Sequence, residues 1–151
     1  MIEAVLPILR ARGLKVSVLK HAHCVVENDV IGKDSWRHRE AGAHEVMLVS
    51  RGRWVLTRQW GEEEEPAMHE VLAAFGECDV LLVESYKYWP IPKIEVHRPA
   101  LGKPLMLDEL PQVIAVASDE PLASAQVGGR EVFALNDAAS IAQRICTELG
   151  L

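Results

Sequence analysis

A short apolar run, "CDVLLVE" at residues 78–84, constrains the fold more than any other feature of this sequence. A strand with one face in water alternates apolar and polar residues, but here four apolar residues follow one another between Asp79 and Glu84. Continuous runs of this kind are typical of strands in a parallel sheet, where helices cover both faces. The run therefore predicts an α/β architecture if the rest of the chain supplies helices between strands.

The rest of the chain supplies that alternation. Apolar residues spaced three and four apart predict a helix from residue 2 to about Arg12, with Gly13 closing it. Strands are predicted at 14–20, 44–50, 53–58, 78–84, 93–97, 112–118 and 131–135, and further helices at 34–41, 66–75 and 136–149. Arg51-Gly52 lies between two of these strands as a tight hairpin turn. We predict a single domain over residues 1–151, with a mostly parallel sheet and one inserted antiparallel hairpin.

Composition limits the classes of protein to which the chain can belong. With 49% apolar residues it buries a core rather than staying disordered. Its net charge of −6 argues against non-specific nucleic-acid binding, which depends on a basic surface. No apolar run reaches the length of a membrane span, and the N-terminus lacks a signal-peptide pattern, so we expect neither membrane association nor export.

The three cysteines, Cys24, Cys78 and Cys146, are odd in number and widely spaced. None forms a C-x-x-C pair, the spacing that would indicate a metal or redox site. This pattern favours reduced thiols that act as small buried apolar residues, and a cytoplasmic location.

Polar residues follow two of the predicted strands, at the edge where open α/β sheets bind ligands. Glu84 ends the strand at 78–84, where a carboxylate can hold a magnesium-bound water or orient a nucleophilic one. Ser118 and Asp119 follow the strand at 112–118. The Asp119 carboxylate could accept two parallel hydrogen bonds from N1–H and the 2-amino group of guanine, a pair that adenine does not present. The plain alternatives are a solvated strand end and ordinary Ser-Asp turn chemistry.

The polar segment at residues 21–33 offers further candidates. Lys33 stands beside a helix N-terminus, where it would make a credible anion contact. Asp29 could take a magnesium ion or a phosphate-bound water. His21 and His23 could ligate a metal, but without a clear third ligand this interpretation is the less favoured one. The plain alternative for the whole segment is a mobile polar loop before a helix that Asp34 or Ser35 caps.

A Gly-Lys pair occurs twice, but neither occurrence is a Walker A phosphate loop. That loop reads G-x-x-x-x-G-K-[ST], because its backbone N–H groups wrap the phosphates while the lysine reaches the outer oxygens. Asp34 follows Gly32-Lys33 and Pro104 follows Gly102-Lys103, and neither pair has the first glycine. The sequence therefore contains no Walker A loop.

Taken together, these segments resemble the MobB family of molybdopterin-guanine dinucleotide biosynthesis adapter proteins, which are P-loop GTP-binding proteins. The resemblance runs over nearly the whole chain, and its most specific part is "LKHAH" followed by "GKDSWRHREAGA". The segments "DVLLVESYK", "PKIEV" and "VIAVASDEP" support it. In this light, Gly32-Lys33-Asp34-Ser35 resembles the family's switch-like motif, which is distinct from its phosphate loop.

The resemblance implies a P-loop NTPase-like fold and a role in molybdenum cofactor maturation. It implies a cytoplasmic homodimer that binds GTP and Mg²⁺ and assists the guanylyltransferase that joins molybdopterin to GMP, with weak GTPase activity at most. Lys33 would contact phosphate, Ser118 and Asp119 the base, and Asp29 and Glu84 the metal. The hairpin at Arg51-Gly52 is a candidate dimer contact.

The chain departs from the family pattern in three places. The family's Walker A strand and loop precede a helix like the one at 2–12, and Met1 falls inside that helix. Where the family's loop carries a run of acidic residues, this chain has Val25, Glu27 and Asp29, of which only the last two are acidic. The family's Glu-Gly-Phe-Lys pattern is Glu-Ser-Tyr-Lys here, at residues 84–87. The absent strand would be central, so its loss would leave two unpaired sheet edges. We hypothesise that Met1 is a late start; the alternative is a short form without strong nucleotide binding.

Two other functional classes stay open. The first is a nucleotide-independent dimeric adapter, which the absence of a Walker A loop favours. The second is a metallochaperone GTPase of related fold, with His21, His23 and Cys24 as metal ligands.

Overall fold

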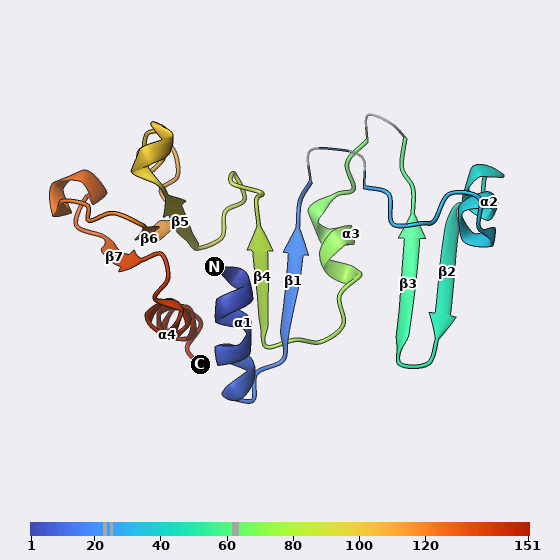
Figure 1. Cartoon of the computed structure of the whole chain (residues 1–151), viewed down its shortest axis with the longest axis horizontal. Helices are drawn as coiled ribbons and strands as arrows, with labels where there is room; N and C mark the ends of the chain where they lie inside the picture. The colour runs from blue at the N-terminus through green and yellow to red at the C-terminus, as the bar shows by residue number, and fades with distance from the viewer. Residues whose placement is uncertain (23, 25, 62–63) are drawn as a thin grey trace. The chain divides into compact units, whose positions relative to one another are not determined.

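The structure, a computed structural model of the chain, describes residues 1–22, 24, 26–61 and 64–151. The chain divides into two compact units, and each is described by itself. We call Met1–His21 with Glu77–Leu151 the sheet unit, and Ala22–Gly76 the hairpin unit. Figure 1 labels the helices and strands, which are α1 (Ile2–Ala11), β1 (Val16–Lys20), α2 (Asp34–Glu40), β2 (Glu45–Ser50), β3 (Arg53–Arg58), α3 (Met68–Ala73), β4 (Val80–Glu84), β5 (Lys93–His97), β6 (Val113–Ser118), β7 (Glu131–Ala134) and α4 (Ala138–Leu149).

Every strand pair in the sheet unit is parallel. β1 pairs with β4, and β6 lies between β5 and β7. The predicted fold class, a mostly parallel α/β architecture with one antiparallel hairpin, is confirmed. Among the described residues, β1, β4, β5 and β7 each pair with a strand on one side only.

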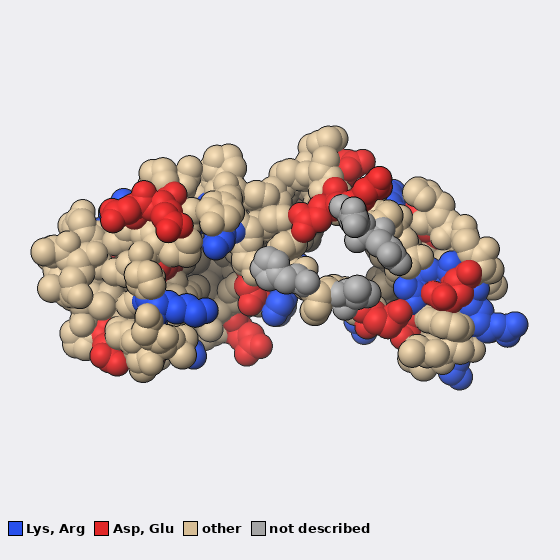
Figure 2. Space-filling model, turned by 90° about the horizontal axis from the view of Figure 1, so that it is seen from above, with Lys and Arg blue, Asp and Glu red and all other residues tan. Residues whose placement is uncertain are grey.

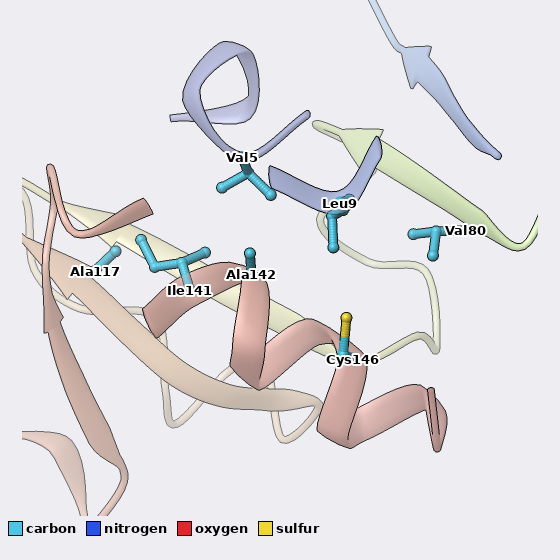
Figure 3. Packing of buried hydrophobic residues seen from close by; sticks show 7 residues of the cluster. All are labelled: Val5, Leu9, Val80, Ala117, Ile141, Ala142 and Cys146. Carbon is cyan, nitrogen blue, oxygen red and sulfur yellow. The ribbon is translucent and has the colours of Figure 1, made fainter. Parts of the chain in front are cut away.

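The core of the sheet unit lies where α1 packs against α4. Figure 3 shows side chains of α1 pointing toward those of α4, with contributions from β4 and β6 beside them. Every member of this cluster is at most 2% exposed; the residues are Val5, Leu9, Val80, Ala117, Ile141, Ala142 and Cys146. The cluster therefore joins elements of both strand sets and both terminal helices.

β6, rather than β4, is the most deeply buried strand. Ala117 faces the cluster between α1 and α4, whereas Val113 and Val116 belong to a second buried cluster with Leu107, Leu110 and Val127. In β4 only Val80 is buried, and the next three residues are half-buried. The reason is position in the sheet, since β6 has a neighbouring strand on each side and β4 only on one.

In the hairpin unit, β2 and β3 pair in register from Glu45 opposite Arg58 to Ser50 opposite Arg53. The predicted turn at Arg51-Gly52 is confirmed, with Gly52 at φ 72°. α2 packs against β2. Because Met47 opposes Leu56 and Val49 opposes Trp54, these four side chains share one face of the ribbon. They are 36–75% exposed, and we call them the hairpin face.

Several local predictions are corrected by the structure. Lys33 occupies the N-cap position of α2 without a side-chain hydrogen bond, because the helix begins at Asp34 and both predicted caps, Asp34 and Ser35, lie inside it. The helix predicted at 66–75 is reduced to Met68–Ala73. α4 begins at Ala138 rather than at residue 136, and it is capped as predicted, with the Asp137 carboxylate accepting a hydrogen bond from the Ser140 N–H at 3.1 Å.

Of the three cysteines, only Cys146 is buried, whereas Cys78 is half-buried and Cys24 is exposed. The prediction that all are buried was therefore wrong for two of them, since Cys24 lies in a loop and Cys78 precedes β4 rather than belonging to it. Acidic and basic side chains lie beside one another on the face shown in Figure 2. No helix among the described residues is both long and apolar enough to span a bilayer.

We expect Leu9→Ala to lower the free energy of unfolding by about 2–5 kcal/mol, because it removes buried methyl groups from a site that other elements hold in place. Leu149→Ala is the matched control, since Leu149 is also helical but 50% exposed. Urea denaturation measures both. Equal effects of the two substitutions would contradict the central place of this cluster.

Candidate functional site

The carboxyl ends of β6 and β7 enclose a pocket of about 250 Å³. Ser118 and Asp119 line it from the end of β6, and Ala134, Leu135 and Asn136 line it from the end of β7. The strands are parallel, with Ser118 opposite Ala134, so the residues that follow them meet at one edge of the sheet. Ligands of α/β sheets bind at such edges.

Asp119 is the charged member of this pocket. Its side chain is 41% exposed, and its Oδ2 atom lies 3.8 Å from Nε of Arg98. An exposed ion pair at this distance is worth less than about 1 kcal/mol, so it leaves the carboxylate open to a ligand. Ser118 is only 3% exposed, and its hydroxyl accepts a hydrogen bond from the Glu120 N–H at 3.2 Å. That bond fixes the turn that presents Asp119.

Glu84 stands at the carboxyl end of β4, directly across from Lys20 of β1. Its carboxylate lies 3.5 Å from the Lys20 ammonium, and the two side chains are 48% and 66% exposed. The next two residues, Ser85 and Tyr86, have positive φ values of 74° and 46°. Non-glycine residues rarely adopt this backbone region, so the chain makes a strained turn immediately after the carboxylate.

A stack of rings holds this turn. The Tyr86 ring stacks on Trp89 at 3.9 Å between centroids, and the His21 ring lies 4.3 Å from Tyr86. The Lys93 ammonium donates hydrogen bonds to the backbone carbonyls of Trp89 and Ile91. Partial burial lowers the pKa of Lys93. These contacts offset the backbone strain and fix where β4 ends.

In the hairpin unit, the loop before α2 is tied to the helix by ion pairs. Asp29 is 6% exposed in its side chain, and its Oδ2 atom lies 3.2 Å from Nε of Arg39. Arg39 also donates to the Glu27 carboxylate, and this hydrogen bond is the largest cause that lowers the pKa of Glu27. A metal ion at Asp29 would have to displace the Arg39 guanidinium. Lys33, four residues after Asp29, is exposed at the start of α2.

The predicted site residues are divided between the units. Ser118 and Asp119 are brought together in one pocket, and Glu84 ends another parallel strand of the same unit. Asp29 and Lys33 belong to the hairpin unit, so their convergence with the others on one ligand stays a prediction.

Within the part of the chain that the structure describes, no three His, Cys, Asp or Glu residues are grouped to hold a metal ion. His23, which the metallochaperone interpretation needs, lies outside the described residues, as does Val25 of the thinned acidic run. Magnesium at Asp29 or Glu84 also stays a prediction.

Two residues that line or contact this pocket escaped the sequence reasoning. Asn136 follows the predicted strand at 131–135 in the same way as Asp119 follows the strand before it, so the strand-end rule was sufficient to find it. Arg98 follows β5 and reaches Asp119. No sequence signal marks that pair, because the two residues come from different strands.

Comparison with known proteins decides the family. The family model described as "Molybdopterin guanine dinucleotide synthesis protein B" (MobB) matches residues 1–119. The chain belongs to the MobB family. A MobB relative from Haemophilus influenzae, described as "Molybdopterin-guanine dinucleotide biosynthesis adapter protein", is 41% identical over 126 residues, which are 81% of this chain and 68% of the relative. The Escherichia coli protein of the same description is 35% identical over 127 residues, 81% of this chain and 71% of that protein.

Solved MobB structures agree with the fold. A crystal structure of molybdopterin-guanine biosynthesis protein B superposes with a TM-score of 0.75 at 27% identity, covering 99% of this chain and 89% of that one. Bacillus subtilis MobB superposes with a TM-score of 0.67 at 23% identity, over 97% of this chain and 86% of that one, which shows the likeness of fold alone. The predicted resemblance to this family is confirmed.

We expect Arg39→Gln to raise the pKa of Glu27 toward its ordinary value of 4.5, because the substitution removes the donor that stabilises the carboxylate. The pKa of Glu27 is depressed in the folded state, so its ionised form stabilises the fold above pH 4.5. That stabilisation is lost as the pH falls through the lowered pKa. Carbon-detected NMR titration of the carboxyl group measures the shift. Arg37→Gln, an exposed arginine on the same helix, is the control, and an equal shift in both variants would contradict the assignment.

Proposed function

We propose that this chain is a GTP-binding accessory protein of molybdopterin guanine dinucleotide biosynthesis that assists the guanylyltransferase. The family match over residues 1–119 carries the proposal, together with the two relatives described as adapter proteins of that biosynthesis. The guanylyltransferase is the partner that such an adapter would serve, because it joins GMP to molybdopterin. The chain would act in the cytoplasm, where that enzyme's nucleotide substrate is made.

The pocket at the ends of β6 and β7 supports guanine as the base. The half-exposed Asp119 carboxylate is an acceptor for two parallel donors, and guanine presents such a pair at N1 and N2. Ala134 and Leu135 supply apolar surface for the faces of the ring. Adenine offers no N1–H, so it would leave one carboxylate oxygen without a donor.

Among the candidate charged residues, some suit phosphate or magnesium better than others. Lys33 is exposed and adjacent to the first turn of α2, which suits an anion. For magnesium, Glu84 fits better than Asp29, because its partner Lys20 is exposed and only weakly paired, whereas Asp29 is buried against Arg39. We expect any GTP hydrolysis to be slow, because none of these residues acts as an arginine finger or an evident catalytic base.

A second function, a dimeric adapter that works without nucleotide, is favoured by the hairpin face. Val49 and Trp54 are 75% and 60% exposed, although they oppose one another on a regular ribbon. Apolar groups gathered in this way mark an interaction surface. A second copy of the chain would cover it with the same residues, as twofold symmetry requires.

We expect GTP to bind this chain in preference to ATP, and Asp119→Asn to weaken GTP binding by roughly 10–100-fold, since a hydrogen bond to a charged group is worth about 1.5–3 kcal/mol. The same variant should gain affinity for XTP, because xanthine carries an oxygen where guanine carries the 2-amino group. Calorimetric titration measures both. Asp108→Asn, an exposed aspartate of the same unit, is the control. Equal binding of ATP and GTP by the unaltered chain would refute guanine recognition.

The role in the pathway is tested with the same pair of variants. Adding the chain to guanylyltransferase, molybdopterin, Mg²⁺ and GTP is expected to raise the rate of dinucleotide formation. If Asp119→Asn retains the full effect, the nucleotide-independent adapter is the correct function. If the unaltered chain has no effect, neither function holds.

We expect Val49→Lys to raise the dissociation constant of a homodimer by roughly 100-fold, because an interface does not readily bury an unpaired ammonium group. Ser50→Lys, which points to the other face of the ribbon, is the control. Sedimentation equilibrium measures the dissociation constants. A monomeric unaltered chain, or equal weakening by both substitutions, would remove the hairpin face as the dimer contact.

A further inference from the structure

The two ends of the pocket differ in chemistry. On the β6 side stands the Asp119 carboxylate, which only accepts hydrogen bonds when ionised. On the β7 side stands the Asn136 side chain, whose amide nitrogen carries two donors. Ala134 and Leu135, the two residues before Asn136, also line the pocket. A ligand that fills the pocket therefore meets a carboxylate acceptor at Asp119 and an amide that can donate or accept at Asn136.

The backbone around Asn136 is fixed by hydrogen bonds of its neighbours. The Leu135 N–H donates to the Ser118 carbonyl at 2.8 Å, which ties this turn to the end of β6. The Asp137 N–H donates to the Ala134 carbonyl at 2.9 Å, and the Asn136 carbonyl accepts from the Ala138 N–H at 3.0 Å. The turn is thus held on both sides of Asn136. Its side chain has no hydrogen-bond partner among the residues that the structure describes, and the residue is exposed.

The edge of guanine matches this order of groups. Its 2-amino group and N1–H are donors, and the adjacent O6 is an acceptor. A base that gives its two donors to Asp119 directs O6 to the neighbouring side of the pocket. Adenine carries an amino group at position 6, so against adenine the Asn136 amide would accept through its oxygen instead of donating through its nitrogen.

We propose that Asn136 is a base-contacting residue of this pocket, whose side-chain amide donates a hydrogen bond to O6 of a guanine bound to Asp119. This proposal rests on the proposed function, because it assumes that the pocket receives a guanine nucleotide. It adds a second contact to the edge of the base, from the end of a different strand from that of Asp119. The Arg98 guanidinium lies 3.8 Å from the Asp119 carboxylate, an ion pair on the β5 side of the pocket.

The test measures the binding of two nucleotides, GTP and 6-thio-GTP, to two proteins, the unaltered full chain and its Asn136→Ala variant. 6-Thio-GTP keeps N1–H and the 2-amino group of GTP, but replaces O6 by sulfur, which is a weak acceptor. We expect the unaltered chain to bind GTP several-fold, up to roughly tenfold, more tightly than 6-thio-GTP. In Asn136→Ala this ratio should fall to about one, since the donor that distinguishes oxygen from sulfur is gone. Calorimetric titration gives the four dissociation constants.

Control variants separate this role from a structural one. Gln112→Ala removes an amide at the amino end of β6, roughly 20 Å along the strand from the pocket, and should leave the ratio unchanged. Asn136→Asp should weaken GTP more than Asn136→Ala does, because a carboxylate repels O6. Gln112→Glu controls for the added charge.

Each outcome decides the proposal. A ratio near one in Asn136→Ala, with the ratio of the unaltered chain kept in Gln112→Ala, supports it. If GTP binds and Asp119→Asn abolishes binding, but the ratio is the same with and without Asn136, the role of Asn136 is rejected while the proposed function stands. If the unaltered chain binds neither nucleotide, both fail. Circular dichroism spectra identical to that of the unaltered chain establish that each variant is folded.

Discussion

The packing of α1 against α4 holds the sheet unit together. Its two sets of strands, β1–β4 and β5–β6–β7, share no ladder hydrogen bonds among the described residues, so backbone pairing does not unite them. The apolar cluster around Leu9 and Ile141 does, because it takes Val80 from one set and Ala117 from the other. The strand ends that carry Glu84 and Asp119 are therefore positioned by side-chain packing. The pocket depends on it as well, since α4 follows Asn136 directly.

Hydrophobic periodicity was sufficient to predict the elements and the fold class. The strands at 93–97 and 53–58 have the bounds that alternation and turn residues gave them. Periodicity could not predict how deeply each strand is buried. The run at 80–83 looks like a central strand but has only one neighbour, whereas burial depends on how many strands surround it. The cap of α2 was misplaced because the helix begins at Asp34, so Asp34 and Ser35 lie within its first turn and Lys33 takes the cap position.

The sequence was sufficient to predict the pocket residues that follow a strand, but not the long side chains that reach them from other parts of the chain. Ser118 and Asp119 follow a strand, and parallel strands bring their carboxyl ends to one edge, so the rule located them. The cations that hold the carboxylates, Arg98 and Arg39, come from elsewhere in the chain. An arginine in sequence has many acidic residues within reach, and only the folded chain selects one. The burial of Asp29 could not be predicted either, because it depends on the contact with Arg39 in the folded chain.

The left-handed turn at Ser85 and Tyr86 limits how this part of the chain can vary. Each residue with positive φ costs about 1–2 kcal/mol when it carries a Cβ atom, and the family pattern that the sequence resembles has glycine at the first of them. The serine is tolerated because the rings of His21, Tyr86 and Trp89 and the bonds of Lys93 hold the turn in place. A codon change to valine or isoleucine at this position would add the clash of a branched side chain to that cost. The backbone at this position therefore suits glycine, asparagine and small polar residues better than branched ones.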